Sequence, residues 1–290
     1  MKNSIQFLNQ FNINTDYIDE ETTVILGFSG YGSVGNVVLN HLIETLPVTS
    51  IGFWGSISWF HQGNLETPIT IYTLDGNSTR NKGKIVFVAS RLPVPVVGYN
   101  ALPDTFWKWL SEEILSWKAK RYIVIGGLRE DIRKTTDEEW TSLIPTPMYT
   151  ELYGTQRTFK DQQTIKGPLN FLLTEGTAFQ QPVLAILSYC NTYDIDIDAS
   201  VLALKELEKI IGDNLHSEKL VEFDSSFLEG ELELISEGEE EFDEYDESFD
   251  EFEENSEEES SNRDKEADFF SLHSSLKRLN DKADDLDKYK

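Results

Sequence analysis

Cysteine is nearly absent from this chain: Cys190 is the only one in 290 residues. A lone cysteine excludes a disulfide framework or a thiolate metal cluster built within one chain, and it favours a reducing compartment such as the cytoplasm. Long apolar runs are missing as well, since no stretch approaches the roughly 18 residues that a membrane span needs. The first six residues, Met1-Lys2-Asn3-Ser4-Ile5-Gln6, hold no long apolar segment, so we expect no secretory signal. The sequence predicts a soluble cytoplasmic protein with no membrane partner.

Basic residues are scarce, with 25 Lys and Arg against 52 Asp and Glu and a formal net charge of −27. Residues 221–262 account for most of the imbalance, because they hold 20 acidic residues and neither Lys nor Arg. Phosphate recognition needs a basic surface, and this segment would repel phosphates. We therefore exclude nucleic acid as a partner.

The composition divides the chain into three parts. Residues 1–215 are rich in Val, Ile, Leu and aromatic residues and are long enough for one folded domain. Residues 216–262 are predicted to be a disordered acidic linker, because such a sequence cannot bury enough apolar area to offset the entropy of ordering it. Residues 263–290 are predicted to form a C-terminal amphipathic helix, whose apolar residues recur at steps of three and four: Phe269, Leu272, Leu276, Leu279, Ala283 and Leu286.

Short β-branched segments alternate with amphipathic ones in the first part. We expect strands at residues 22–26, 48–54, 69–74, 84–89, 121–125 and 183–189. Helices are expected over residues 34–46, after an N-cap at Asp104, and from an N-cap at Asp198 to a stop at Gly212. Between residues 126 and 182 the Pro and Thr content indicates longer excursions. The alternation predicts a layered α/β domain with a central sheet between helices.

A glycine-rich turn joins the first strand to the first helix. Gly30-Tyr31-Gly32-Ser33-Val34-Gly35 satisfies the G-x-G-x-x-G pattern of dinucleotide sites. That pattern also requires a carboxylate near the end of the second strand, yet residues 45–65 contain neither Asp nor Glu. The alternative is a tight turn in which the glycines allow close packing, and we therefore predict no cofactor here.

Other candidate sites lack the residues that their chemistry requires. Asp194, Asp196 and Asp198 have the spacing of a calcium loop, but such a loop needs Gly and Glu where Ala199 and Lys205 stand. The four histidines, like Cys190, show no metal-ligand or nucleophile pattern; they are His41, His61, His216 and His273. His41 and Cys190 are interpreted as core residues. We predict neither a catalytic nor a metal site.

Aromatic residues cluster at Phe53, Trp54, Trp59 and Phe60. Core packing is the default interpretation of such a cluster. A protein interface is the alternative, because tryptophans are enriched there.

Three segments resemble the proteasome assembly chaperone 2 family. The first is Val24-Ile25-Leu26-Gly27-Phe28-x-Gly30-x-Gly32-x-Val34-Gly35-Asn36, the second is Ile123-Val124-Ile125-Gly126-Gly127-Leu128, and the third is the Asp-rich turn and helix of residues 194–207. Together they span about residues 20 to 212. The family glycine turn maps onto Gly27, Gly30, Gly32 and Gly35.

The resemblance implies a three-layer α/β fold similar to nucleoside phosphorylases but used as a binding scaffold. It also implies ATP-independent binding of proteasome α subunits or of the core particle, with self-association or pairing with a related chain. Some relatives dock through a C-terminal hydrophobic residue, a Tyr and one further residue. This chain ends Lys288-Tyr289-Lys290, which keeps the Tyr but places Lys where the hydrophobic residue would be.

Three functions follow from these observations. The first is a non-enzymatic proteasome assembly chaperone that docks through Lys288, Tyr289 and Lys290. The second is a nucleotide- or nucleoside-binding enzyme that uses the turn from Gly30 to Gly35. The third is an adaptor that acts through its acidic segment.

Overall fold

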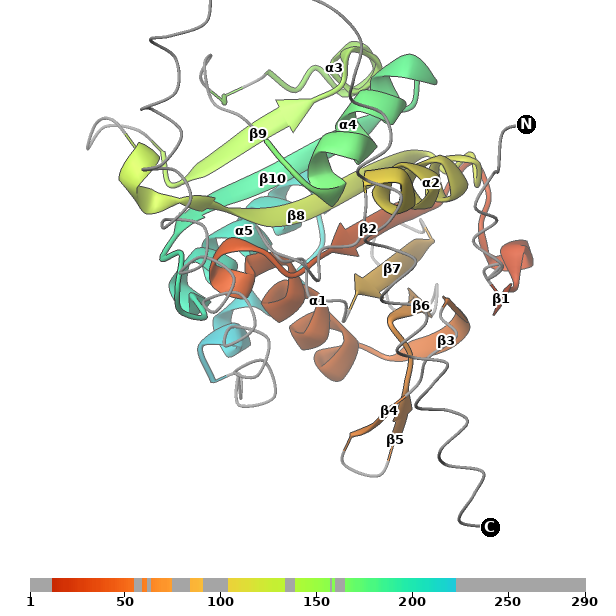
Figure 1. The fold of residues 1–290 in the computed structure, drawn as a ribbon, viewed down its shortest axis with the longest axis horizontal. Helices are drawn as coiled ribbons and strands as arrows, with labels where there is room; N and C mark the ends of the chain where they lie inside the picture. The colour runs from red at the N-terminus through yellow and green to blue at the C-terminus, as the bar shows by residue number, and fades with distance from the viewer. Residues whose placement is uncertain are drawn as a thin grey trace, which may run out of the picture. The chain divides into compact units, whose positions relative to one another are not determined.

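The computed structural model describes residues 12–54, 59–61, 64–74, 84–90, 104–133, 139–156, 158–159 and 165–222. Its centre is an eight-stranded mixed sheet with the strand order β1-β3-β6-β7-β2-β8-β10-β9 (Figure 1). Strands β7, β2, β8 and β10 are parallel neighbours, while β9, β6, β3 and β1 join them antiparallel. The strands are β1 (Asn12–Ile13), β2 (Thr23–Gly27), β3 (Val48–Trp54), β6 (Ile69–Leu74), β7 (Ile85–Ser90), β8 (Arg121–Arg129), β9 (Thr141–Pro145) and β10 (Val183–Cys190).

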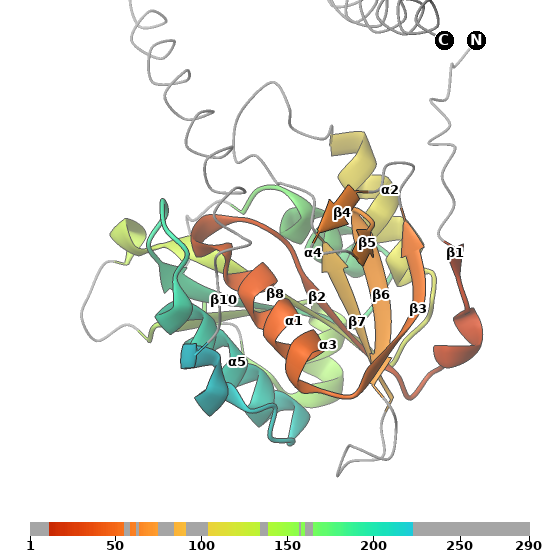
Figure 2. The same ribbon diagram turned by 90° about the horizontal axis from the view of Figure 1, so that it is seen from below.

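Helices cover both faces of this sheet. One apolar cluster joins α1 (Val34–Thr45) and α5 (Ile197–Ile211) to one face, and a second joins α2 (Asp104–Leu115) and α4 (Pro168–Ala178) to the other. Figure 2 shows α1 and α5 side by side across their face. The short α3 (Pro147–Tyr153) buries Tyr149 in the first cluster. The described residues also form four 3-10 helices: Thr15–Tyr17, Tyr31–Ser33, Glu130–Ile132 and Ser217–Glu222.

Strand β2 shows why the central strands are apolar throughout. All five of its residues are buried, and alternate side chains enter opposite layers. Val24 and Leu26 pack in the cluster of α2 and α4, whereas Ile25 packs in that of α1 and α5. A strand buried on both faces requires a continuous apolar run rather than an alternating one. The predicted three-layer α/β fold is confirmed.

The strands and helices predicted within residues 1–215 are found, but both predicted N-caps are wrong. Asp104 is the first residue of α2 rather than its cap. The strands at 48–54 and 69–74 have the expected bounds, and β8 continues to Arg129 because its second half pairs with β10. Helix α5 begins after Asp196, whose carboxylate accepts a hydrogen bond from Ala199 N at 2.8 Å. The predicted cap, Asp198, lies exposed within the first turn instead. Gly212 ends the helix in the left-handed conformation, as expected.

The stretch from residue 126 to 182 is more regular than we expected. It contains β9, α3 and α4 as well as the end of β8. Both helices start with proline, which suits the first helical turn because the missing N–H would have no partner there. Thr146 caps α3 by accepting from Tyr149 N at 3.4 Å. The Pro and Thr content thus marks helix starts rather than long loops.

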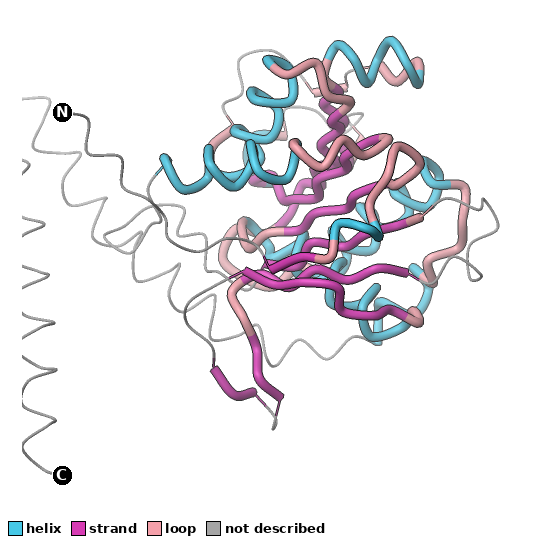
Figure 3. Tube along the Cα trace, turned by 90° about the vertical axis from the view of Figure 1, so that its right-hand side faces the viewer, coloured by secondary structure: helices cyan, strands magenta, loops and turns pink. Residues whose placement is uncertain are grey.

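The aromatic cluster divides between core and surface. Trp54 is buried and packs against Phe106 and Trp109, with ring centroids 4.9 and 5.8 Å apart. Phe53, the next side chain along β3, is 41% exposed. The separate hairpin of β4 (Trp59–His61) and β5 (Asn64–Glu66) follows, and Figure 3 shows it standing off the end of the main sheet. The side chains of Trp59 and Phe60 lie outside the described residues.

Several sequence predictions concern residues that the structure does not describe. These are the acidic segment from residue 223 onward, the C-terminal helix, and the terminal Lys288, Tyr289 and Lys290. Within the described ranges, every helix is too short or too polar to cross a bilayer.

Candidate functional site

The three sequence motifs meet at the carboxyl ends of β2, β8 and β10. Gly27 ends β2, and the chain then passes through the 3-10 helix Tyr31–Ser33 into α1. Gly127 lies near the end of β8, where it pairs with Ser188 of β10. The Asp-rich turn follows β10, and Asp196 N donates to the carbonyl of Gly32 at 3.0 Å. Segments far apart in the sequence thus share one backbone assembly.

The glycines of this assembly allow backbone to pack on backbone. A Cβ on Gly127 would lie 2.1 Å from the carbonyl oxygen of Tyr31, and one on Gly35 would lie 2.6 Å from that of Ile125. A Cβ on Gly27 would meet the carbonyl oxygen of Gly35 at 2.3 Å. Real Cβ atoms do not approach carbonyl oxygens so closely, so each position requires glycine.

Gly32 and Gly30 differ in what they require. Gly32 has φ +62, in the left-handed region, and a Cβ there would lie 2.8 Å from Cys190 Cβ. Gly30 has extended backbone with φ 173, and a Cβ would meet nothing within 4 Å. Three of the four family glycines, Gly27, Gly32 and Gly35, are therefore fixed by packing, while Gly30 is free of that constraint.

This geometry supports the packing interpretation over a dinucleotide site. In such a site the second glycine faces the pyrophosphate, whereas Gly32 faces the Cys190 side chain. The ribose carboxylate should also come from a strand beside the first one. Here β3 follows α1 in the chain, but β7 and β6 stand between it and β2 in the sheet. Strand β3 is therefore not the neighbour of β2 from which a ribose carboxylate would come.

The Asp-rich turn is organised by its own hydrogen bonds. Asp196 accepts from Asn191 N at 2.9 Å and from Ala199 N at 2.8 Å, and Asp194 accepts from Asn191 Nδ2 at 2.8 Å. Its carboxylates therefore serve the loop and the helix cap. Among the described residues, no group of three or more His, Cys, Asp or Glu side chains is placed to hold a metal ion.

Cys190 and His41 are core residues, as predicted. Cys190 is buried, its Sγ donates to Leu128 O at 3.3 Å, and burial raises the pKa of its thiol to about 12. A thiol with this pKa stays protonated at neutral pH and is a poor nucleophile. His41 is 2% exposed, and its Nε2 contacts His216 O at 3.1 Å.

Arginine and aromatic side chains surround the assembly, and we call this set the rim: Tyr31, Arg129, Arg133, Trp140 and Tyr193. Arg129 hydrogen-bonds both carboxylate oxygens of Asp131, which raises the Arg129 pKa, as do the nearby Tyr31 and Tyr193 to a smaller degree. The Arg133 guanidinium lies 3.9 Å from the centroid of the Trp140 ring. Tyr193 is 62% exposed and Trp140 41%. Exposed Tyr, Trp and Arg side chains are the types that dominate protein interfaces.

Sequence reasoning missed this rim. Its members come from four separate places, of which only Tyr31 lies inside a recognised motif. The one local signal is Arg129-x-Asp131 directly after the Ile-Gly-Gly-Leu strand end, since opposite charges two residues apart can pair within a turn. Lys288, Tyr289 and Lys290 are outside the described residues, so their place relative to the rim is not part of the structure.

The family model and the solved structures that this chain matches agree with each other. A family model described as the PAC2 family matches residues 24–233. No curated protein matches the sequence. Among solved structures, Pyrococcus furiosus PbaA, described as an archaeal homolog of proteasome-assembly chaperone, superposes with a TM-score of 0.62 at 20% identity, covering 80% of this chain and 99% of that one.

Two further structures show the same fold. A protein of unknown function from Thermoplasma acidophilum has a TM-score of 0.58 at 17% identity, covering 80% of this chain and 93% of that one. Pyrococcus furiosus PbaB, described as an archaeal proteasome activator, has a TM-score of 0.55 at 16% identity, covering 82% and 98%.

Proposed function

The chain belongs to the PAC2 family, and from this premise we propose that it is a chaperone-like protein that binds proteasome α subunits or the core particle without catalysis or ATP. The observation that carries the proposal is the family match over residues 24–233, which includes all three segments of the packed glycine assembly. PbaA and PbaB, which share the fold, are described as an archaeal homolog of proteasome-assembly chaperone and as an archaeal proteasome activator.

The folded domain and the C-terminus would each contribute a separate binding surface. The rim supplies the surface of the folded body, with side chains that extend from two 3-10 helices and from the ends of the neighbouring strands. Tyr289 and the terminal carboxylate of Lys290 supply a docking tip: the ring offers buried area and a hydroxyl donor, and the carboxylate suits a Lys in a pocket. Only the aliphatic stem of Lys288 fits an apolar slot. The predicted acidic linker began at residue 216, but residues 217–222 form a 3-10 helix, so its proposed part is residues 223–262. This self-repelling segment would extend the reach of the tip.

We also propose that the protein works in the cytoplasm as a homo-oligomer or paired with a related chain. Several copies would raise the effective concentration of their tips at a ring of repeated subunits. The experiment is affinity purification of the full-length chain from its native host, with proteasome α subunits as the expected co-purifying proteins. Absence of every proteasome subunit from the purified material would contradict the function.

Binding of purified core particle then separates the two proposed surfaces. Tyr289→Ala and a chain with one residue added after Lys290 test the tip, and Tyr193→Ala tests the rim. Tyr17→Ala is the matched control, since Tyr17 is 43% exposed and follows β1, the strand at the edge of the sheet far from β10. Loss of binding in both tip variants supports docking through the terminus. Unchanged binding in those two and in Tyr193→Ala would leave both surfaces without a role.

A further inference from the structure

The end of the described chain folds back over α1 and α5. After Gly212 ends α5, residues 213–222 turn and form the 3-10 helix Ser217–Glu222. Leu215 is 2% exposed and Leu220 is fully buried, both in the apolar cluster that α1 and α5 share. This segment therefore covers apolar surface of two helices just before the long acidic stretch begins.

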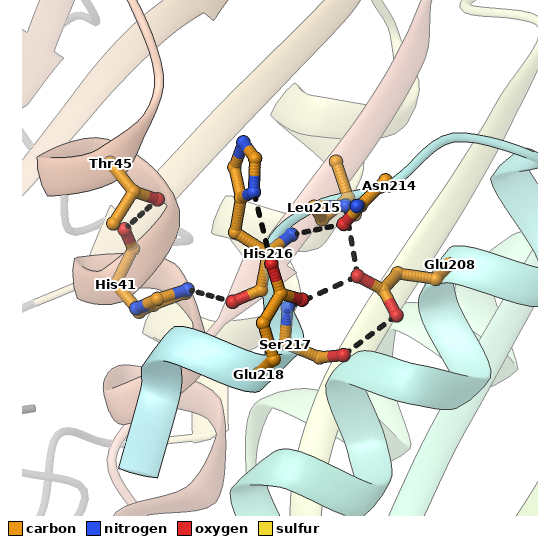
Figure 4. A network of polar contacts seen from close by, with 8 residues as sticks. All are labelled: His41, Thr45, Glu208, Asn214, Leu215, His216, Ser217 and Glu218. Atoms are coloured by element: carbon orange, nitrogen blue, oxygen red, sulfur yellow. Dashed lines mark hydrogen bonds and ion pairs between the residues drawn. The ribbon is translucent and has the colours of Figure 1, made fainter. Parts of the chain in front are cut away.

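Glu208 of α5 holds the segment on one side. Its carboxylate accepts hydrogen bonds from Leu215 N at 2.9 Å, Ser217 N at 3.1 Å and Ser217 Oγ at 2.8 Å (Figure 4). An ionised carboxylate has no hydrogen to donate and has about four acceptor positions, so it can accept from these three donors together. One side chain thus fixes the path of the chain where it leaves α5.

His41 of α1 holds the segment on the other side. Its Nε2 lies 3.1 Å from the carbonyl oxygen of His216, and that oxygen also accepts from Lys219 N at 2.9 Å. Because a carbonyl can only accept, Nε2 carries the hydrogen. Figure 4 shows the segment between His41 and Glu208, which come from different helices.

The turn between these two contacts is strained. His216 has φ 62, a left-handed conformation that is costly for a residue other than glycine. Its N–H donates to Asn214 Oδ1 at 2.8 Å, and its Nδ1 lies 3.3 Å from Glu218 Oε1. A strained turn held by a few polar contacts favours release when one of those contacts becomes unfavourable.

We propose that residues 213–222 form a latch, closed by His41 and Glu208, that opens when His41 gains a proton and then uncovers the apolar surface between α1 and α5. The proton would place a charge on a side chain that is 2% exposed in the closed form. Opening returns the imidazolium to water. The latch therefore couples mild acidification to exposure of the apolar surface of α1 and α5, next to the point where the C-terminal segment leaves the folded domain.

The groups around His41 support this direction. Burial lowers the His41 pKa, and hydrogen bonding to the backbone of His216 and Leu215 raises it by less. The charge of His216 lowers the His41 pKa further, whereas the charge of Glu218 raises it. These groups all belong to the latch, and Glu208 on α5 contacts its other side. Since burial outweighs the rest, the closed form favours neutral His41.

Amide hydrogen exchange of the full chain at pH 7.5 and 5.5 tests the latch. The reporting amides are those of Leu215, Ser217 and Lys219, and the Thr23 amide, bonded to Lys84 O within the sheet, is the reference. After correction for intrinsic rates, we expect protection of the three to fall by up to about tenfold at pH 5.5, the limit for one proton on a histidine of ordinary pKa. The Thr23 amide should keep its protection.

Three variants identify the responsible groups. His41→Gln keeps a side-chain donor but cannot titrate, so its latch amides should be equally protected at both pH values; His41→Asn serves if that variant does not fold. His216→Asn removes the neighbouring histidine and should retain the pH response. Glu208→Gln should weaken protection at both pH values. Unchanged wild-type protection at pH 5.5, or an equal loss in His41→Gln, would overturn the proposal.

Discussion

Gly127 of β8 lies directly against the carbonyl group of Tyr31, which belongs to the turn between β2 and α1: a Cβ on Gly127 would stand 2.1 Å from the Tyr31 oxygen. This contact joins the two most distinctive sequence motifs of the chain. A side chain there would also meet Cys190 Sγ at 2.6 Å, so neither neighbour leaves room. The glycine pattern is thus a packing requirement at the meeting point of three parallel strands.

Gly127→Ala should destabilise the fold by about 1–3 kcal/mol, because backbone rather than a flexible side chain must move to admit the methyl group. Gly30→Ala is the matched control within the same motif, and it should change the free energy of unfolding by less than about 0.5 kcal/mol. Chemical denaturation of both variants measures the difference. Equal stability of Gly127→Ala and wild type would show that the contact yields without cost.

The glycine turn should bind no nucleotide. Cys190 occupies the space that faces Gly32, and β3 is separated from β2 by two strands, so the pyrophosphate and ribose contacts of a dinucleotide site are both unsupported. Calorimetry with NAD, NADP and ATP at millimolar concentration should show no binding heat. A micromolar affinity for any of the three would contradict this and revive the enzyme hypothesis.

Much of the layered fold could be predicted because the central strands are buried on both faces. A strand such as β10 is buried along its whole length and reads as a nearly continuous apolar run, so the predicted bounds, 183–189, miss only Cys190 at its end. The latch could not be predicted, since His41 and His216 are 175 positions apart and neither lies in a motif. The rim was missed for the same reason: Arg129 and Tyr193 meet only because β8 and β10 are adjacent.

The wrong cap of α5 shows a different limit. Asp196 and Asp198 are two residues apart, and both residue types favour an N-cap. What distinguishes them is Asn191, whose N–H donates to Asp196 Oδ2 at 2.9 Å and draws that residue into the turn. This additional hydrogen bond from the preceding loop selects Asp196 as the N-cap, and it cannot be predicted from the helix-capping preferences of Asp196 and Asp198 alone.

Asp196→Ala should therefore cost about 0.5–2 kcal/mol of stability, the usual range for loss of a capping side chain. The variant loses the hydrogen bonds from Ala199 N and Asn191 N, and both amides lie in the turn that also bonds to Gly32. Asp198→Ala is the control. Asp198 is exposed in the first helical turn, where a negative charge contributes only about 0.3–1 kcal/mol through the helix dipole. Urea denaturation of the two variants should rank Asp196→Ala as the less stable, and the reverse order would restore Asp198 as the cap.

Cys190 should resist thiol reagents in the folded protein and react only after unfolding. Its pKa is raised to about 12, first by burial and then by the charge of Asp196, so at pH 8 roughly one thiol in ten thousand is ionised. An unfolded cysteine has a pKa near 8.5 and is then about one quarter ionised. Labelling with a low concentration of an aromatic disulfide reagent at pH 8 should therefore follow the small unfolded population, and it should become fast in denaturant. Gly127→Ala, which crowds the sulfur, should label faster in proportion to its loss of stability. Rapid labelling of the native wild-type chain would mean that the ends of β8 and β10 open locally, and that the assembly beneath Tyr31 is not the rigid platform on which the rim depends.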